Sequence, residues 1–317
     1  MNRETAHIRT MHTRKWSVYF QNPEFIEYTR MDMVMPEYEP LIRKWCGIRD
    51  GVRVLEAGCG TGYFSRLLAR GGCRDASFTG IDFDDIFIEY ARGKAAEEGL
   101  DICFEVGDAC SLPYEDGTFD VVASHTFLTT MPEPEKAFSE MKRVAKPGGL
   151  IASVTSMSTM PAAFSPGNYP PECNTSWRKE LQDLTIRLLR AYRNTNPMSG
   201  YVTGVKMHRI PGFFAEQGME QISAFPVGKI DSLSNAALSD EHKRRRIDLY
   251  EQSEVSKLEA FMALPEMAEW FSREEADRYL ELLAMKCDFL RSDLRENSIW
   301  EWNGGANILV TGIVPSK

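Results

Sequence analysis

A glycine-rich turn near residue 60 constrains the fold of this 317-residue chain more than any other feature. The segment Val54-Leu55-Glu56-Ala57-Gly58-Cys59-Gly60-Thr61-Gly62-Tyr63 reads as an apolar strand, then alternating glycines, then the start of a helix. Glycine permits tight turning and lets a ligand approach the backbone closely. Because open α/β sheets bind ligands at the carboxyl ends of their strands, the segment predicts a ligand-binding turn of this kind.

Residues 51–156 continue the alternation between strands and helices. Strands are expected at 53–56, 77–81, 102–106, 119–124 and 150–154, and helices at 63–69, about 84–98 and 132–144. Strands separated by helices of this length favour right-handed βαβ units and a sheet that is covered on both faces. The expected fold class is therefore α/β, with a doubly wound and mostly parallel sheet.

The rest of the chain predicts helical additions to this core. The expected parts are an N-terminal helical segment (1–50), the cofactor-binding core (51–156), a helical insert (157–205), a core continuation (206–232), a second helical insert (233–303) and a terminal strand of the core sheet (304–317). In the first insert, apolar residues from Trp177 to Tyr192 share one helical face. In the second, Ser272 and Glu275 form a capping box that predicts the start of a helix.

Charge, apolar runs and cysteines limit the class of partner. The chain has 37 Lys and Arg against 46 Asp and Glu, and a formal net charge of −9 disfavours nucleic acid and anionic membranes as partners. The apolar runs are shorter than the roughly 20 residues of a membrane helix, and the polar N-terminus shows no secretory signal. Seven cysteines without C-x-x-C spacing favour reduced thiols over a zinc site or a disulfide framework. We therefore expect a cytoplasmic protein with a small-molecule substrate and without a bound metal.

The spacing of the turn narrows the class of ligand further. The pattern G-x-G-x-G differs from a P-loop and from the G-x-G-x-x-G of dinucleotide folds, and bulky Tyr63 stands where those folds need a small residue. Asp82 follows a strand 24 residues after Gly58, where a carboxylate can accept hydrogen bonds from both hydroxyls of a ribose. The other role for Asp82, a helix N-cap, can be filled by Asp84 or Asp85.

Four segments in this order resemble the class I S-adenosylmethionine-dependent methyltransferases, closest to the small-molecule group that includes the ubiquinone and menaquinone type. These segments are Glu56–Gly62 (motif I), Gly80–Asp82 (the ribose-binding segment), Val106–Ala109 followed by Leu112-Pro113 and Phe119-Asp120, and Arg143–Gly149 before the fifth strand. The likeness covers about residues 50–156 and is weaker at 206–230 and 304–314. It does not extend to the helical inserts, so the sequence leaves the methyl acceptor open.

The resemblance implies a seven-stranded sheet in which the terminal strand, 306–312, is antiparallel, and it implies S-adenosylmethionine as the cofactor. The implied cofactor-binding residues are Glu56, Gly58, Cys59, Gly60, Gly62, Asp82, Asp108, Ala109 and His125. In this family the first acid steadies the glycine turn, and the glycines pass beside the methionine part. In this family the aspartate at the position of Asp108 contacts the adenine amino group, and the backbone amide of the next residue contacts the adenine ring.

His125 is the candidate catalytic base, because it ends the fourth strand and histidine has a pKa suited to proton transfer near neutrality. The other interpretation is that His125 only lines the pocket or contacts the cofactor. Thr126 and His208 are weaker candidates for contact, and Tyr19 and Tyr28 could close over the cofactor or simply pack a helix.

The predicted function is methyl transfer to a small organic acceptor, in a pocket roofed by the aromatic-rich helical inserts. Two alternatives stay open: a nicotinamide-dependent oxidoreductase, and a non-catalytic module that binds S-adenosylmethionine. The sequence leaves open the atom that is methylated, the need for a base and the oligomeric state.

Overall fold

The computed structural model describes residues 15–19, 21–34, 36–131, 133–156, 167–168, 176–195, 209–227, 238–294, 300–301 and 307–316. The chain divides into two compact units. The sheet unit comprises residues 29–157, 200–229 and 305–317, and the helical unit comprises residues 1–28, 158–199 and 230–304. The candidate site lies in the sheet unit, so that unit is described first.

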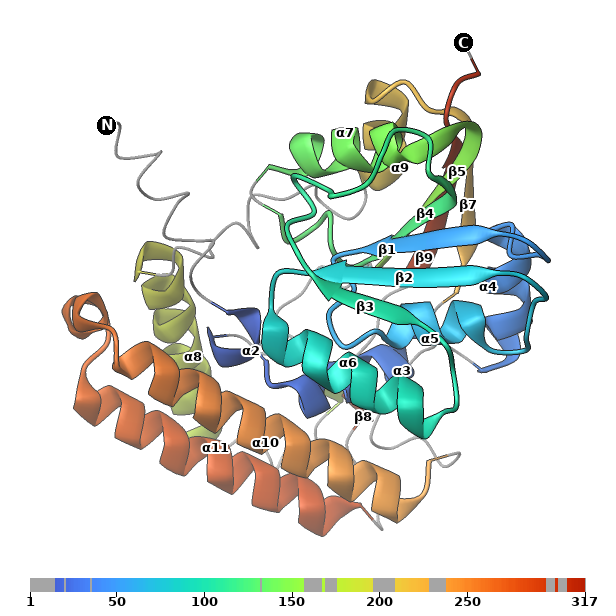
Figure 1. Ribbon diagram of the computed structural model, residues 1–317. Coiled ribbons are helices and arrows are strands. Elements are labelled where there is room, and N and C mark those ends of the chain that lie inside the picture. The colour runs from blue at the N-terminus through green and yellow to red at the C-terminus, as the bar shows by residue number, and fades with distance from the viewer. Residues whose placement is uncertain are drawn as a thin grey trace, which may run out of the picture. The chain divides into compact units, whose positions relative to one another are not determined.

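The described part of the sheet unit contains a seven-stranded sheet in the order β3-β2-β1-β4-β5-β9-β7 (Figure 1). Its strands are β1 (Arg53–Ala57), β2 (Ser77–Asp82), β3 (Cys103–Val106), β4 (Phe119–His125), β5 (Ala145–Ser156), β7 (Glu220–Pro226) and β9 (Asn307–Ile313). Neighbouring strands from β3 to β5 pair in parallel, whereas β9 is antiparallel to both β5 and β7. The expected α/β fold class and the antiparallel terminal strand are therefore confirmed.

Helices cover both faces of this sheet (Figure 1). They are the 3-10 helix η1 (Pro36–Tyr38), α4 (Glu39–Trp45), α5 (Tyr63–Ala69), α6 (Asp85–Glu97), α7 (Pro134–Val144) and α9 (Ile210–Glu216). Helix α3 (Pro23–Met33) begins in the helical unit and ends in the sheet unit. Phe138 of α7 packs against Phe213 and Phe214 of α9 on one face. Ile42 of α4 and Phe64 of α5 belong to the apolar cluster on the other face. These layers leave the carboxyl ends of the parallel strands at one edge.

Strand β5 begins earlier than the sequence predicts, because the turn Lys146–Gly149 lies inside the strand instead of before it. Ala145 pairs with Phe119 and Leu150 pairs with Val121, so the register shifts across the turn. The Gly148 N–H donates to the Val314 carbonyl, and the Val314 N–H donates to the Gly149 carbonyl. Backbone pairing with the segment after β9 therefore keeps the turn in the sheet.

The helical unit has three long helices in its described part. Its elements are α2 (Trp16–Tyr19), α8 (Ser176–Thr195), α10 (Asp240–Met262), the 3-10 helix η6 (Pro265–Glu269), α11 (Arg273–Asp293) and two short paired strands, β6 (Gly167–Asn168) and β8 (Trp300–Glu301). In Figure 1, α10 and α11 lie side by side. Leu184, Leu188, Phe261 and Leu283 belong to the apolar core between these helices.

The sequence signals for these helices are confirmed. Ser272 and Glu275 form the predicted capping box at the start of α11: the Glu275 N–H donates to the Ser272 hydroxyl, and the Ser272 N–H donates to the Glu275 carboxylate. The predicted apolar face of α8 is buried at Leu181, Leu184 and Leu188.

Over the ranges that the structure describes, we find no helix with both the length and the apolar character needed to cross a membrane.

Candidate functional site

The glycine turn links β1 to α5, as expected. Gly58, Gly60 and Gly62 have φ angles of 66°, 51° and 73°, a region that side chains other than glycine rarely adopt. A Cβ atom on Gly62 would lie 2.6 Å from the Phe104 ring, whereas a Cβ atom on Gly60 would meet nothing within 4 Å. The turn is therefore closely packed at its helix end and open at Gly60, where a ligand could approach the backbone.

Most of the backbone N–H groups of this turn donate hydrogen bonds within the protein. The N–H groups of Gly58 and Cys59 both donate to the Ile81 carbonyl, at 2.9 and 3.0 Å, and the Gly62 N–H donates to the Cys59 carbonyl at 2.9 Å. The Gly60 N–H donates to Asp82 Oδ2 at 2.9 Å. A loop that binds phosphate instead directs free N–H groups at its ligand. This geometry disfavours a pyrophosphate ligand and therefore the nicotinamide dinucleotide alternative.

Glu56, buried in β1, holds the first turn of α5. Its Oε2 atom accepts hydrogen bonds from the Ser65 N–H at 2.8 Å and from the Ser65 hydroxyl. The first N–H groups of a helix lack partners within the helix, and the Glu56 carboxyl group accepts from one of them. Burial raises the pKa of Glu56 to about 8, although the Ser65 hydrogen bonds oppose that shift. The contacts agree with the expected role of Glu56 in steadying the turn.

Asp82 ends β2 and fastens the turn to that strand. Besides the Gly60 contact, its Oδ1 atom accepts from the Asp84 N–H at 3.0 Å. Asp84 is the N-cap of α6, because its side chain accepts from the Ile86 N–H at 3.2 Å, so Asp82 is not needed for that role. Burial raises the pKa of Asp82 to about 6. Each carboxylate oxygen can accept more than one hydrogen bond, so Asp82 can still receive ligand hydroxyls.

Three exposed apolar side chains lie at or shortly after the ends of β2 and β3. Asp82 pairs in register with Val106 of β3, and the Gly107 N–H donates to the Asp82 carbonyl at 2.9 Å, so the two strand ends lie side by side. Phe83, Ile86 and Val106 are 40%, 38% and 54% exposed, which is unusual for large apolar side chains. Exposed apolar side chains near the carboxylates of two neighbouring strand ends suit a nucleoside, which has a flat base and a diol.

Asp108 and Ala109 follow β3 at the same edge. Asp108 Oδ1 accepts from the Cys110 N–H at 2.8 Å, which closes a tight turn, and Ala109 is buried inside it. Asp108 and Ala109 are candidates expected from the sequence, whereas Phe83 and Ile86 are not among those candidates. The signal that could have found Phe83 is a large apolar residue directly after the ribose-binding acid.

Cys59 is buried in the turn, with its Sγ atom 3.8 Å from the Gly60 carbonyl oxygen. Burial, together with the nearby Asp82 and Glu56, raises the pKa of this thiol well above its usual 9.0. Only a thiolate is a good nucleophile or metal ligand. The surroundings therefore favour a small packed residue over a redox role for Cys59.

His125 is the last residue of β4 and is 7% exposed. Its ring lies 5.4 Å from that of Phe64 and 6.4 Å from that of Tyr63, measured between ring centroids. Nε2 is buried and has no hydrogen-bond partner among the described residues. Burial, and to a smaller extent the charge of Arg30, holds the pKa of His125 well below its usual 6.5. The imidazole is therefore neutral at pH 7.

The backbone is strained directly after His125. Thr126 has a φ of 53°, which is uncommon for a β-branched residue, and its N–H donates to the Val154 carbonyl at 2.8 Å. This turn places the ring of Phe127 against the glycine turn, because a Cβ atom on Gly58 would lie 2.1 Å from Phe127 Cδ2. Phe127 is not among the residues expected from the sequence, because motif spacing gives no signal for it.

The remaining candidates are His208, Tyr19 and Tyr28. His208 lies outside the described residues. Tyr19 and Tyr28 belong to the helical unit, where Tyr19 packs edge-on against Phe261 at 5.9 Å and the Tyr28 hydroxyl donates to the His242 carbonyl at 3.0 Å. In the described ranges, no group of three or more His, Cys, Asp or Glu side chains is arranged to hold a metal ion.

Part of the sheet unit is similar in sequence to known proteins. Residues 55–153 match the family model described as a methyltransferase domain. The demethylmenaquinone methyltransferases of Staphylococcus aureus strains MRSA252 and JH9 are both 36% identical to this chain over 122 residues. The match covers 38% of this chain and 50% of each enzyme, so the chain spans about half the length of the curated relatives it matches.

Two solved structures are similar over more of the chain but at lower identity. A SAM-dependent methyltransferase from Aquifex aeolicus is 19% identical, with 65% of this chain and 93% of that chain covered and a TM-score of 0.44. Phosphoethanolamine N-methyltransferase 2 of Haemonchus contortus, solved with S-adenosyl-L-methionine, is 19% identical, with 88% of this chain and 53% of that chain covered and a TM-score of 0.46. The family match coincides with the residues that form the glycine turn and the strand ends around it. Over residues 55–153, the chain is therefore similar to methyltransferase domains, as the resemblance of its sequence motifs implies.

Proposed function

We propose that the protein transfers a methyl group from S-adenosylmethionine to a small organic acceptor in the cytoplasm. One observation carries the proposal: an open glycine turn, with most of its N–H groups engaged, is bonded to Asp82 at the end of β2, and Asp108 follows the neighbouring strand β3. This arrangement offers acceptors for a nucleoside and no phosphate site, which agrees with the methyltransferase match of residues 55–153.

The residues present fit S-adenosylmethionine. Asp82 would accept the ribose hydroxyls, and Asp108 with the Ala109 backbone would meet the adenine. Phe83 would offer the ring an apolar surface. Gly58 and Gly60 would pass beside the methionine part, where the backbone at Gly60 is open. When bound, S-adenosylmethionine supplies a methyl group on a positively charged sulfur, which is already activated for transfer.

Because the methyl group is activated, the protein mainly has to hold the acceptor in line with it, and orientation alone can lower a barrier greatly. A site that excludes water also helps, because charge on the sulfonium disappears as the methyl group moves. His125 is the residue that we propose for proton transfer, through its buried and unpartnered Nε2. Its low pKa keeps it neutral and able to accept a proton, but it makes the imidazole a weaker base than an exposed histidine.

A small acceptor is supported by the relatives and by the charge of the chain. The Staphylococcus aureus proteins are named for demethylmenaquinone, a small organic acceptor, and they match 38% of this chain. The net charge of −9 argues against nucleic acid as the acceptor.

Isothermal titration calorimetry of the full chain tests the cofactor assignment. We expect saturable binding of S-adenosylmethionine and S-adenosylhomocysteine, and no binding of NAD or NADH at the same concentrations. Binding of NAD without binding of S-adenosylhomocysteine would overturn the proposal in favour of the oxidoreductase alternative.

A further inference from the structure

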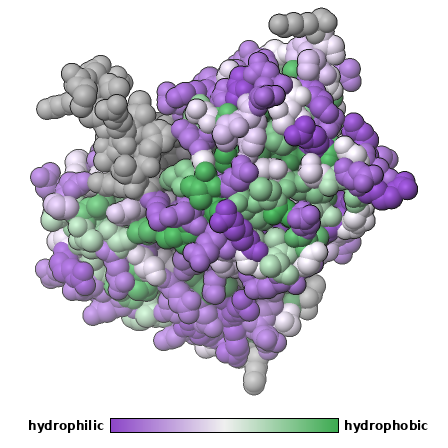
Figure 2. Space-filling model, in the orientation of Figure 1, coloured by the Kyte–Doolittle hydropathy of each residue, from purple (hydrophilic) through white to green (hydrophobic). Residues whose placement is uncertain are grey.

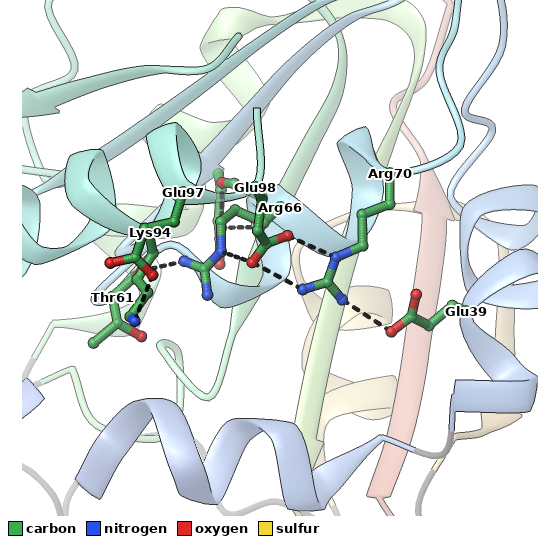
Figure 3. Close-up of polar contacts among 9 residues, drawn as sticks. Glu39, Thr61, Arg66, Arg70, Lys94, Glu97 and Glu98 are labelled. Atoms are coloured by element: carbon green, nitrogen blue, oxygen red, sulfur yellow. Dashed lines mark hydrogen bonds and ion pairs between the residues drawn. The ribbon is translucent and has the colours of Figure 1, made fainter. Parts of the chain in front are cut away.

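A fully buried arginine reaches the glycine turn from α5. The side chain of Arg66 has 0% exposure. Its Nη1 atom donates to the Thr61 carbonyl at 2.7 Å, and its Nε atom donates to Glu98 Oε1 at 2.8 Å (Figure 3). Thr61 stands between two glycines of the turn, and Glu98 is the C-cap of α6. One guanidinium group therefore joins the turn after β1 to the end of the helix after β2.

Stability alone does not explain a buried arginine at this position. All seven residues of α5 are buried, and Phe64, Leu67 and Leu68 show that apolar side chains pack well there. Removing a guanidinium from water is costly, and apolar residues of similar volume often replace buried ion pairs without loss of stability. Arginine differs from such residues in its rigid set of donors, which can fix two acceptors in defined directions.

The acceptor in the turn sets the orientation of one peptide group. The Thr61 carbonyl and the Gly62 N–H belong to the same planar unit. Arg66 holds the carbonyl end, and the Cys59 carbonyl accepts from the N–H end at 2.9 Å. Both ends of this peptide are thus fixed, so it cannot rotate, although the glycine beside it would permit rotation.

A second peptide of the turn is fixed in a different way. The N–H between Cys59 and Gly60 donates to Asp82, the proposed ribose ligand, at 2.9 Å. The backbone of the turn is therefore held from one side by Asp82 and from the other by Arg66. The open part of the turn, at Gly60, lies between these two contacts.

We propose that Arg66 is a positioning residue for the cofactor: it holds the Thr61–Gly62 peptide and so keeps the glycine turn in the shape that accepts the methionine part of S-adenosylmethionine. The proposal rests on the proposed function, because it assigns Arg66 a role in binding that cofactor. Arg66 acts through the turn and through α6, and it does not itself contact the ligand.

Arg70 provides a matched control on the same helical segment. It donates to both oxygens of Glu98, at 2.9 and 3.1 Å, and to Glu39 at 3.0 Å (Figure 3). Its side chain is 33% exposed, and none of these contacts reaches the turn. Arg70→Met therefore removes a comparable guanidinium and a contact to the same glutamate, while the bond to the Thr61 carbonyl remains.

The test measures binding of S-adenosylhomocysteine by calorimetry, together with the thermal midpoint, in the wild type, Arg66→Met, Arg66→Lys, Glu98→Gln and Arg70→Met. We expect Arg66→Met to weaken binding at least tenfold, of the order expected when a charged hydrogen bond is lost. Arg66→Lys should recover part of this loss, because one ammonium can still donate to the carbonyl. Glu98→Gln should cause a smaller loss, about threefold, since it weakens only the hydrogen bond between Arg66 and residue 98 and leaves the bond to the Thr61 carbonyl. Arg70→Met should bind as the wild type does.

A spectroscopic readout separates positioning from general destabilisation. In glycine-labelled protein, the Gly60 and Gly62 amide signals should shift in both Arg66 variants and stay in place in Arg70→Met. If Arg66→Lys and Glu98→Gln both bind as tightly as the wild type, the proposal is wrong, even if Arg66→Met fails to fold. If the wild type itself binds no S-adenosylhomocysteine, the proposed function fails, and the proposal for Arg66 fails with it.

Discussion

Asp82 has two roles, and both depend on its carboxylate. It fastens the glycine turn through the Gly60 N–H, and it is the carboxylate proposed to bind ribose. We expect Asp82→Ala to weaken binding of S-adenosylhomocysteine by about 1.5–3 kcal/mol, roughly 10- to 150-fold, because hydrogen bonds to a charged acceptor are lost. Calorimetry measures this, with Asp101→Ala as the control at an exposed carboxylate. Undiminished affinity in Asp82→Ala would remove the ribose assignment.

The pH dependence of binding follows from the same carboxylate. Burial raises the pKa of Asp82 to about 6, so the group is mostly ionised at pH 7 and becomes protonated as the pH falls through 6. Protonation removes an acceptor, so the affinity for S-adenosylhomocysteine should fall between pH 7 and pH 5. The isosteric variant Asp82→Asn should bind more weakly at pH 7 and show a flatter profile. Equal slopes in the two proteins would assign the pH dependence to another group.

His125 allows a separation of chemistry from contact. If it takes the proton of the acceptor, His125→Ala should lower the methylation rate by about 100-fold or more while binding of S-adenosylhomocysteine changes little. Because its pKa lies well below 6.5, the wild-type rate should show no loss from this group between pH 6.5 and 8, and should fall at lower pH as the imidazole becomes protonated. If His125 is only pocket wall, the KM for the acceptor should change more than the rate. An unchanged rate and an unchanged cofactor affinity would exclude both roles.

Candidate site residues that stand at fixed spacing along one segment could be predicted from the sequence. Glu56, Gly60 and Asp82 stand at motif positions. The Gly60 N–H donates to Asp82, and Glu56 accepts from the Ser65 N–H at the start of α5. Phe127 and Arg66 were missed for a physical reason. Their roles depend on a ring that reaches Gly58 and on a guanidinium that reaches the Thr61 carbonyl. Such contacts arise from packing, and no spacing rule predicts them.

At the scale of elements, the order of strands and helices from β1 to β4 follows the sequence closely, because each apolar strand is separated from the next helix by a turn or a capping residue. Asp84, for example, is the N-cap expected at the start of α6. The predicted start of β5 was wrong. The turn at its beginning pairs with the segment after β9, which is about 160 residues further along the chain. Pairing between such distant segments cannot be read from local patterns.

The junction of β1 and α5 should be less stable at high pH because of Glu56. Its pKa is raised from the usual 4.5 to about 8, so the folded state keeps a proton that the unfolded state has released. This contribution to stability is fully present below pH 4.5 and is lost as the pH rises through 8. The thermal midpoint of the wild type should therefore fall more between pH 5 and pH 8 than that of Glu56→Gln. Glu97→Gln, at an exposed position of α6, is the control, and parallel profiles in all three proteins would contradict the assignment.

At the scale of the whole molecule, the chain combines a sheet unit that carries the cofactor motifs with a helical unit that carries much of the aromatic content. The surface shown in Figure 2 is mostly polar, with apolar patches between the polar areas. The expectation that the helical inserts roof the substrate stays a prediction, and within the loop from Pro161 to Asn174 the structure describes residues 167–168 alone.

Limited proteolysis tests whether the N-terminal segment and the helical inserts form the predicted roof. A roof must open to admit the acceptor, so some of its segments should be accessible to protease when no ligand is bound. Early cuts are expected within residues 1–35 or 157–175, and S-adenosylhomocysteine should slow them. Early cuts within 50–156, or cuts that no ligand slows, would show that these segments do not close over the site.

The most direct measurement of the proposed function follows the methyl group itself. The full chain is incubated with S-adenosylmethionine labelled on the methyl carbon and with a small-molecule extract, and both products are quantified. The label should enter a compound of low molecular mass, with one S-adenosylhomocysteine formed for each methyl group transferred, and Asp82→Ala should reduce both products together. Tight binding of S-adenosylmethionine without any labelled product would contradict catalysis and leave a binding module, and label found only in protein or nucleic acid would contradict a small organic acceptor.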